Sequence, residues 1–310
     1  MLKSVAAAAA LLLAAAPAVA APASSVSLPG TRLFPESITA TRNGDLYIGS
    51  FGNGGVYRAK AGASAAALWL DPAKTGIKTA LGVFADESQG VLFVCSISSQ
   101  EVARDPASQF LYAFDLKTGA PKAKIAMPDP AKAVCNDMDI GKDGALYVTD
   151  TGTSSIYRLG KGGSKLETWI TDARLAGIDG IATAGDGGFY VNSVTVSKLF
   201  HIAMGADGKA GGITELKPSL PLAGPDGMRK TAGDRFLLAE NSATSGRVSE
   251  VTVNGDQASV RVIKQDPGVT AMTLIGNRVW IDNAKFAYRT GQAKGAEDPG
   301  PFVIYSAPLR

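Results

Sequence analysis

The sequence has 310 residues, a formal net charge of +3 and only 19 % charged residues. It contains no run of basic residues, so the charge pattern argues against a nucleic-acid-binding surface and we expect no nucleic-acid partner. The 36 glycines and the scattered aromatic residues are typical of a turn-rich, all-β chain.

The first residues predict a cleaved signal peptide. Lys3 precedes an Ala/Leu-rich run, and the small residues Ala18-Val19-Ala20 follow Pro17. A charged start, a short apolar run and a small-residue site are the three parts of an export signal. We expect cleavage after Ala20, with Ala23 as the alternative position, and a retained N-terminal anchor as the alternative fate. Residues 21–310 are then one domain, periplasmic or secreted, with no membrane contact after cleavage.

Four segments of the chain repeat one pattern. Each opens on an acidic or amide residue and continues as a short alternating strand, a turn and a second strand of β-forming residues. Asn-Gly and Asp-Gly pairs in three of them predict tight hairpins. The segments are ESITATRNGDLYIGS from Glu36, NDMDIGKDGALYVTD from Asn136, DGIATAGDGGFYVNS from Asp179 and DGMRKTAGDRFLLAE from Asp226.

Two further segments fit the same frame, LGVFADESQGVLFVC from Leu81 and VTAMTLIGNRVWIDN from Val269. The six starts recur every 43 to 55 residues, and ten positions after each start an apolar residue opens the second strand. Repeats of this length predict an all-β, six-bladed β-propeller with its inner strands around a channel. A TIM barrel is poorly supported, because no amphipathic helical stretches separate the strands.

The sixth unit is short of one strand. It holds RVWIDN and FVIYSAPL near the C-terminus, and we expect the N-terminal segment SVSLPGTRL to supply the missing strand. That pairing closes the ring and removes an exposed sheet edge.

The first residue of each unit is expected at one mouth of the channel. Three carboxylates gathered there repel one another unless a cation neutralises them. Carboxylate and amide oxygens suit Ca²⁺, Mg²⁺ or Mn²⁺, and Zn²⁺ also binds carboxylates. An Asp before a Gly is also common in turns, which is the alternative explanation for two of these residues. The four oxygen-bearing residues are Glu36, Asn136, Asp179 and Asp226, whereas the other two units have Leu81 and Val269.

The single histidine, His201, falls in the third strand of the fourth unit, away from the channel register. We expect a structural role for it. A Ser-His-Asp triad and a histidine-ligated metal are therefore disfavoured, and base catalysis falls to a carboxylate, a lysine or a metal-bound hydroxide.

The repeat and the motif Pro225-Asp226-Gly227-Met228 resemble the senescence marker protein, regucalcin and gluconolactonase family of six-bladed propellers. The resemblance covers nearly all of the mature chain and is weakest in the second and sixth units. It implies one divalent cation, Ca²⁺ before Mn²⁺, Mg²⁺ or Zn²⁺, and hydrolysis of sugar lactones. It implies metal ligands at Glu36, Asp179 and Asp226 and substrate contacts at Asn136 and Asp137.

The chain departs from that family at three points. Ser37-Ile38 replaces the Gly-Pro after the first ligand, Asp179 replaces an Asn ligand, and the family's second-blade Arg has no match. The extra charge at Asp179 favours tighter cation binding and weaker Lewis acidity. On this hypothesis Asp226 is both a ligand and the general base toward water.

Polar residues at the ends of the second strands are expected near the same mouth. They are channel-mouth candidates for substrate contact, with ordinary solvent-facing strand ends as the alternative. These residues are Ser50, Asp150, Ser193, Glu240 and Asn283.

The two cysteines, Cys95 and Cys135, belong to the second and third units. Cys95 ends a second strand and Cys135 directly precedes Asn136, so both are expected near one mouth on adjacent blades. Export would place them in an oxidising compartment. A disulfide and two buried free thiols are both open.

Other functions remain as alternatives to a metal-dependent lactonase. One is a non-catalytic exported propeller that binds a small ligand or a protein. Another is a strictosidine-synthase-like enzyme with Glu240 as its channel glutamate; a paraoxonase-like enzyme would need a second histidine. The expected partner is a lactone or another carbohydrate-derived small molecule, bound by a monomer.

Overall fold

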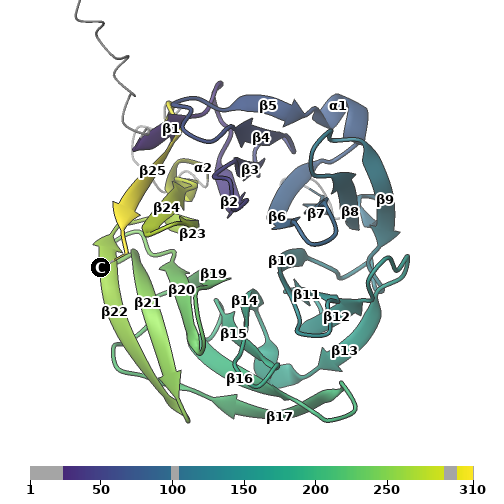
Figure 1. Cartoon of the computed structure of the whole chain (residues 1–310), viewed down its shortest axis with the longest axis vertical. Coiled ribbons are helices and arrows are strands. Elements are labelled where there is room, and N and C mark those ends of the chain that lie inside the picture. Colours follow the sequence, from purple (N-terminus) through teal and green to yellow (C-terminus); the bar gives the residue numbers. More distant parts are fainter. Residues whose placement is uncertain (1–23, 99–104, 290–298, 310) are drawn as a thin grey trace, which may run out of the picture.

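In the computed structural model the chain forms a ring of β-sheets around a central channel (Figure 1). The structure describes residues 24–98, 105–289 and 299–309. In these residues there are six sheets, so the predicted all-β, six-bladed propeller is confirmed. The expected signal peptide, residues 1–20, lies outside the described residues.

The first three blades each have four antiparallel strands, ordered outward from the channel. Blade 1 has β2 (Pro35–Ala40), β3 (Leu46–Ser50), β4 (Val56–Ala59) and β5 (Ala67–Leu70). Blade 2 has β6 (Thr79–Asp86), β7 (Val91–Ile97), β8 (Phe110–Asp115) and β9 (Pro121–Ala126). Blade 3 has β10 (Cys135–Ile140), β11 (Leu146–Asp150), β12 (Ser155–Leu159) and β13 (Glu167–Thr171).

The other three blades repeat this arrangement, with one extra strand at the outer edge of blade 5. Blade 4 has β14 (Ile178–Thr183), β15 (Phe189–Ser193), β16 (Lys198–Met204) and β17 (Ala210–Glu215). Blade 5 has β19 (Pro225–Lys230), β20 (Arg235–Glu240), β21 (Arg247–Asn254), β22 (Gln257–Gln265) and the outer β18 (Lys217–Pro218). Blade 6 has β23 (Val269–Ile275), β24 (Arg278–Asn283), β25 (Val303–Pro308) and β1 (Ser25–Ser27).

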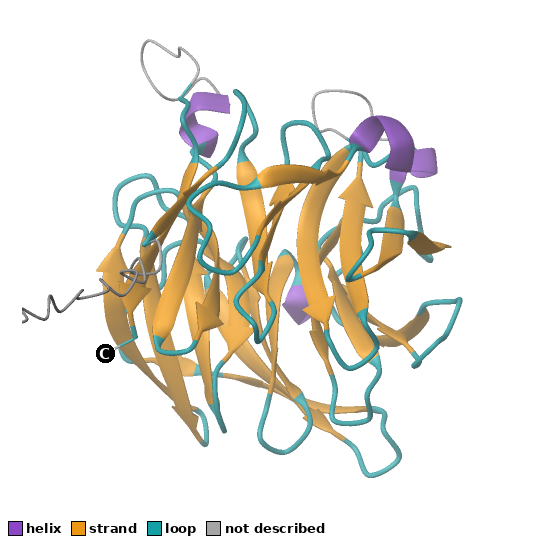
Figure 2. Ribbon diagram, turned by 45° about the horizontal axis from the view of Figure 1, so that its top comes forward, coloured by secondary structure: helices purple, strands orange, loops and turns teal. Residues whose placement is uncertain are grey.

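Helical structure among these residues is confined to single turns. They are α1 (Pro72–Thr75), α2 (Phe286–Arg289), and the 3₁₀ turns η1 (Pro106–Ser108) and η2 (Ala173–Leu175). The oblique view shows helical turns at the upper edge of the ring and one near the middle of the view (Figure 2). In the described part of the chain, no helix is both long enough and apolar enough to cross a membrane.

The ring closes as the sequence predicts. β1 pairs antiparallel with β25, and Val26 lies opposite Ile304. Val26 and Leu28 are both buried, and the Leu28 amide donates to the Phe302 carbonyl at 3.0 Å. The N-terminal segment therefore completes blade 6 as its outermost strand.

The channel residue of blade 6 is Thr270, and the expected Val269 is wrong by one position. Val269 pairs with Asn283 as Pro35 pairs with Ser50, so Thr270 is the counterpart of Glu36. The reason is a shorter hairpin, because only Gly276 and Asn277 separate β23 from β24. Val269 is fully buried in the apolar core instead.

The two Asp-Gly pairs that open the fourth and fifth units lie within inner strands and are not turns. Asp179-Gly180 belongs to β14 and Asp226-Gly227 to β19. A Cβ on Gly180 would lie 2.5 Å from the Asp226 carbonyl oxygen. Glycine is required there because the backbone of the next blade approaches too closely for a side chain.

Candidate metal-binding and active site

Four oxygen-bearing side chains converge at one mouth of the channel. Each belongs to the second residue of an inner strand: Glu36 on β2, Asn136 on β10, Asp179 on β14 and Asp226 on β19. Together with Thr270 they line a cavity of about 10 Å³, which is room for the centre of one water molecule or ion. The four are 7 to 8 % exposed, so solvent reaches the cavity only narrowly.

Hydrogen bonds hold three of these side chains. Asn136 Nδ2 donates to Asp179 Oδ2 at 2.8 Å and to Thr151 Oγ1 at 2.9 Å. Asp226 Oδ2 accepts from Asn241 Nδ2 at 3.1 Å. These bonds hold Asn136 against Asp179 and fix one oxygen of Asp226 beside the cavity that all four side chains line.

Other oxygens of the site have no partner among the described residues. Glu36 Oε2 and Asp179 Oδ1 are buried and accept no hydrogen bond there, and Thr270 Oγ1 is unpartnered too. Leaving a buried carboxylate oxygen unsatisfied costs free energy, so such atoms mark a place for an absent ligand or a proton.

Burial and mutual repulsion raise the pKa of all three carboxyl groups well above their ordinary values. For Glu36 the main cause is burial, followed by the charge of Asp179. For Asp179 it is burial and then the charge of Asp226, and for Asp226 it is burial and then the charge of Glu36. Each carboxylate thus makes the next harder to ionise, and a bound cation would relieve that repulsion.

The donor set fits a divalent cation, although the coordination shell is not yet assembled. Three carboxylates, two with a free buried oxygen, and one amide carbonyl are ligands that hard cations prefer. Within the described ranges, no three His, Cys, Asp or Glu side chains are already grouped closely enough to hold a metal ion. Binding would therefore require small side-chain movements that draw the carboxylates inward.

An arginine that sequence reasoning missed, Arg229, crosses the channel beneath this cavity. It lies on β19, is 9 % exposed, and its Nη1 donates to both carboxylate oxygens of Asp137 at 2.7 Å. Its position on an inner strand could have predicted an ion pair, because a buried arginine needs an acidic group or other acceptor beside it in the channel.

This ion pair bears on the predicted substrate contacts. Asp137 is buried, and its carboxylate is engaged by Arg229 and by the Met138 amide. The role of Asp137 in substrate binding stays a prediction, and the structure gives its carboxylate another partner. Asn136, in contrast, lies at the mouth as expected.

Two of the five channel-mouth candidates, Asp150 and Glu240, are fully buried and hydrogen-bonded to nearby groups. Asp150 Oδ1 accepts from the amides of Val134, Gly152 and Thr153, and burial raises the pKa of Asp150. Glu240 is paired with Arg247, with 2.5 Å between its Oε1 and the arginine Nε. Both hold loops at this end of their blades, and neither is among the residues lining the cavity.

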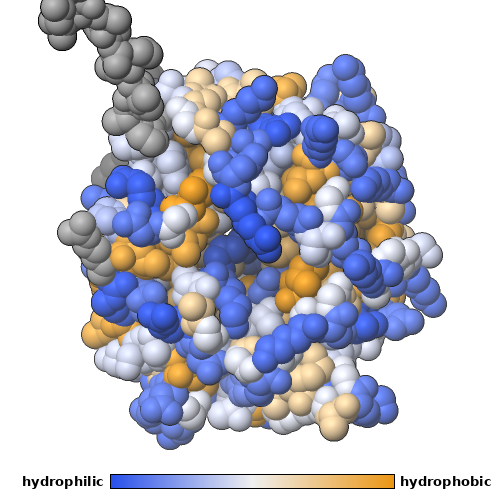
Figure 3. Space-filling model, viewed as in Figure 1, coloured by the Kyte–Doolittle hydropathy of each residue, from blue (hydrophilic) through white to orange (hydrophobic). Residues whose placement is uncertain are grey.

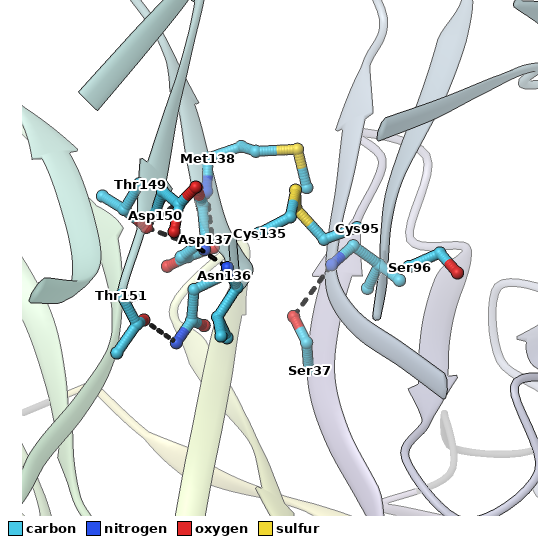
Figure 4. Close-up of a disulfide and its surroundings, with 12 residues drawn as sticks. Ser37, Cys95, Ser96, Cys135, Asn136, Asp137, Met138, Thr149, Asp150 and Thr151 are labelled. Carbon is cyan, nitrogen blue, oxygen red and sulfur yellow. Dashed lines mark hydrogen bonds between the residues drawn. A yellow bond between two sulfur atoms is a disulfide. The ribbon is translucent and has the colours of Figure 1, made fainter. Parts of the chain in front are cut away.

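Cys95 and Cys135 form a disulfide between β7 of blade 2 and β10 of blade 3. Figure 4 shows the bond beside Asn136, which directly follows Cys135 and is hydrogen-bonded to Thr151. The bond therefore ties blade 2 to the strand of blade 3 that carries Asn136.

His201 lies on β16, the third strand from the channel, and pairs across the sheet with Tyr190. Its Nε2 lies 3.1 Å from Asp186 Oδ2, in the β14–β15 hairpin. This hairpin is at the opposite end of β14 from Asp179, so the single histidine is outside the channel site. Hydrophilic and hydrophobic residues both border the hollow at the middle of the ring (Figure 3).

Comparisons with known proteins extend this description at the level of the fold. No model of a known protein family matches the sequence, and no curated protein matches it significantly. Regucalcin from Agrobacterium tumefaciens, described as a calcium-binding protein, is 16 % identical, with a TM-score of 0.61 over 92 % of this chain and 97 % of that one.

Two further structures are similar to the same degree. A structural-genomics protein assigned as a gluconolactonase is 14 % identical, with a TM-score of 0.63 over 88 % of this chain and 87 % of its own. Virginiamycin B lyase from Staphylococcus aureus is 14 % identical, with a TM-score of 0.62 over 92 % and 98 % of the two chains. The chain is thus a six-bladed β-propeller whose fold resembles those of regucalcin, a gluconolactonase and a lyase.

Proposed function

We propose that this protein is a metal-dependent hydrolase of lactones or related small cyclic esters. The observation that carries the proposal is the pair of buried, unpartnered carboxylate oxygens, Glu36 Oε2 and Asp179 Oδ1, at a cavity the size of one ion. Glu36, Asp179 and Asp226 would hold the cation. When bound, a divalent cation would polarise the ester carbonyl and stabilise the negative charge that develops on its oxygen.

The side chains have distinct parts in this reaction. The Asp226 carboxylate accepts a proton from the water that attacks the carbonyl carbon, and that proton passes to the oxygen that leaves as the ring opens. Asn136, fixed by Thr151 and Asp179, orients the substrate at the mouth. The cavity itself is too small for a sugar ring, so the substrate binds on the solvent side of the carboxylates.

Similarity to a lyase does not extend to its chemistry. One solved structure of virginiamycin B lyase is of a variant made catalytically inactive by replacing a histidine with alanine. The only histidine of this chain is His201, on the third strand of blade 4 and paired with Asp186. Carboxylates therefore remain the candidates for proton transfer in the channel.

The second candidate is an exported propeller that binds a ligand or protein without catalysis. It is favoured by the narrow cavity and by the pairing of Asp137 with Arg229, which leaves fewer free polar groups for a substrate. It would use the same cation-binding residues, so it differs from the first candidate only in turnover.

The test is lactone hydrolysis by the metal-stripped protein with Ca²⁺, Mn²⁺, Zn²⁺ or no addition. We expect activity only with cation, and a loss of about 100-fold or more in Asp226→Asn, since removing a general base typically costs that much. Asp139→Asn is the matched control, because Asp139 is a carboxylate on β10 that accepts hydrogen bonds from Thr183 away from the cavity.

Equal activity in the stripped wild type and in Asp226→Asn would overturn the lactonase proposal. Cation binding by the wild type without hydrolysis of any lactone would favour the non-catalytic candidate.

A further inference from the structure

The guanidinium of Arg229 is surrounded by oxygen atoms from four blades. Its Nη1 donates to the Asp137 carboxylate on blade 3 and to the Met228 carbonyl of its own blade 5 at 2.6 Å. Its Nη2 donates at 3.3 to 3.4 Å to the Ser37 hydroxyl and the Ile38 carbonyl of blade 1 and the Val83 carbonyl of blade 2. One side chain therefore ties four of the six inner strands together across the channel.

This set of acceptors is what a hard cation would bind. One carboxylate, one hydroxyl and three backbone carbonyls are the oxygen types that surround Ca²⁺ in proteins. The three backbone carbonyls belong to inner strands, and each accepts a hydrogen bond from the Arg229 guanidinium. An arginine guanidinium satisfies them because it is a permanent cation with five donors in a plane.

The Arg229 guanidinium also acts on the carboxylates of the mouth, because it lies beside the same cavity. Arg229 lines the same cavity as Glu36, Asp179 and Asp226, and its Nε is buried without an acceptor among the described residues. Its positive charge also opposes the rise in the pKa of Glu36. The channel thus holds two groups of oxygens, one at the mouth and one on the floor, and Arg229 occupies the floor.

We propose that Arg229 is a tethered cation that fills a cation site on the channel floor, formed by Asp137, Ser37 and the carbonyls of Ile38, Val83 and Met228. Because the floor site is filled by the chain itself, the channel keeps one exchangeable cation, at the mouth. That the wild type binds one cation rests on the proposed function. The assignment of Arg229 as the cation of the floor site does not.

The test is to remove the guanidinium and supply a free cation. In Arg229→Ala, we expect CaCl₂ or millimolar methylguanidinium to raise the Tm in proportion to the logarithm of its concentration, as binding to the folded state requires. Calorimetry should count two Ca²⁺ per chain in this variant and one in the wild type. Arg229→Lys keeps a tethered cation and should stay at one.

Arg58→Ala is the matched control. Arg58 also donates to a carboxylate, Asp45, through Nε and Nη2, but its side chain is 22 % exposed and lies outside the channel. Methylguanidinium should not reverse the decrease in Tm that this variant shows.

The outcomes separate the two proposals. A folded Arg229→Ala protein that gains no more from Ca²⁺ or methylguanidinium than Arg58→Ala would overturn the floor site. An Arg229→Ala protein that folds only with Ca²⁺ or methylguanidinium would support the floor site. If neither cation restores its folding, and Arg229→Lys binds a second Ca²⁺, the floor site is overturned. A wild type that binds none of Ca²⁺, Mn²⁺ and Zn²⁺, beside an Arg229→Ala that binds one Ca²⁺, would overturn the proposed function alone.

Discussion

Asp282, on β24 of blade 6, is a buried acid whose two oxygens have no partner among the described residues. The register aligns it with Thr149 and Asn192, which donate to the carbonyls of Asp179 and Asp226 on the next blade. At the closure of the ring the next strand is β2, and β24 does contact β2. A protonated Asp282 could serve as the corresponding donor, whereas a carboxylate could not.

Asp282 should therefore make stability depend on pH. Burial, followed by the charge of Asp266, raises the pKa of Asp282 well above its ordinary value. A carboxyl whose pKa is higher in the folded state stabilises the fold below its unfolded pKa, and that contribution is lost as the pH rises through the folded pKa. In EDTA between pH 5 and pH 8, we expect the free energy of unfolding to fall less in Asp282→Asn than in the wild type.

The measurement is urea unfolding at several pH values. Asp207→Asn is the control, because Asp207 is exposed and paired with Lys209, and its pKa is lowered rather than raised. In this control, the free energy of unfolding should change with pH as it does in the wild type. An Asp282→Asn protein with the wild-type slope as well would contradict the prediction.

At the scale of the elements, one position of the second strand recurs as the contact between neighbouring blades. It is the second-strand residue just before the one paired at the start of the inner-strand bulge: Gly49 in blade 1, Cys95 in blade 2, Thr149 in blade 3 and Asn192 in blade 4. A Cβ on Gly49 would lie 3.2 Å from the Leu81 carbonyl, and Cys95 is bonded to Cys135. The disulfide thus replaces a hydrogen bond that other blades use at the same place.

Removing this bond should lower stability without changing the fold. It closes a loop with a sequence separation of 40 residues, for which the restriction of the unfolded chain predicts about 3–4 kcal/mol. We expect the variant Cys95→Ala/Cys135→Ala to lose that amount in guanidinium unfolding. The wild type under reducing conditions should lose a similar amount.

Peptide mapping under non-reducing conditions gives an independent check. Recovery of two free thiols, or an unchanged stability of the double variant, would show that the bond does not form in the protein.

For the whole molecule, stability depends on the closure of the ring by a short N-terminal strand. Only three residues, Ser25–Ser27, pair with β25, and Val26 is the one whose side chain is buried. A charge at that position could not be paired or solvated while the strand stays in place. The closure therefore rests on a small apolar contact between the two ends of the chain.

Val26→Asp should open this seam. We expect a loss of about 3 kcal/mol or more, because an apolar contact is lost and a carboxylate is buried. Ser25→Asp is the control, since Ser25 is exposed in the same strand and should change stability little. Thermal unfolding of both variants gives the comparison, and equal Tm values would contradict the role of β1 in closure.

The sequence by itself determined the number of blades, the closing strand and four of the residues at the channel mouth. These follow from local rules, since alternation and hairpin turns fix each pair of strands and the repeat fixes which residues are equivalent. The same rules failed by one residue at Val269, where a two-residue hairpin shortened the unit.

Only the tertiary structure decided what crosses the channel and what each polar group binds. Arg229 and Asp137 are 92 positions apart, and Asp282 meets blade 1 only where the ring closes. Such contacts depend on how blades lie around the axis, which no local pattern encodes. The channel mouth was therefore readable from the repeat, whereas the ion pair on its floor required the assembled ring.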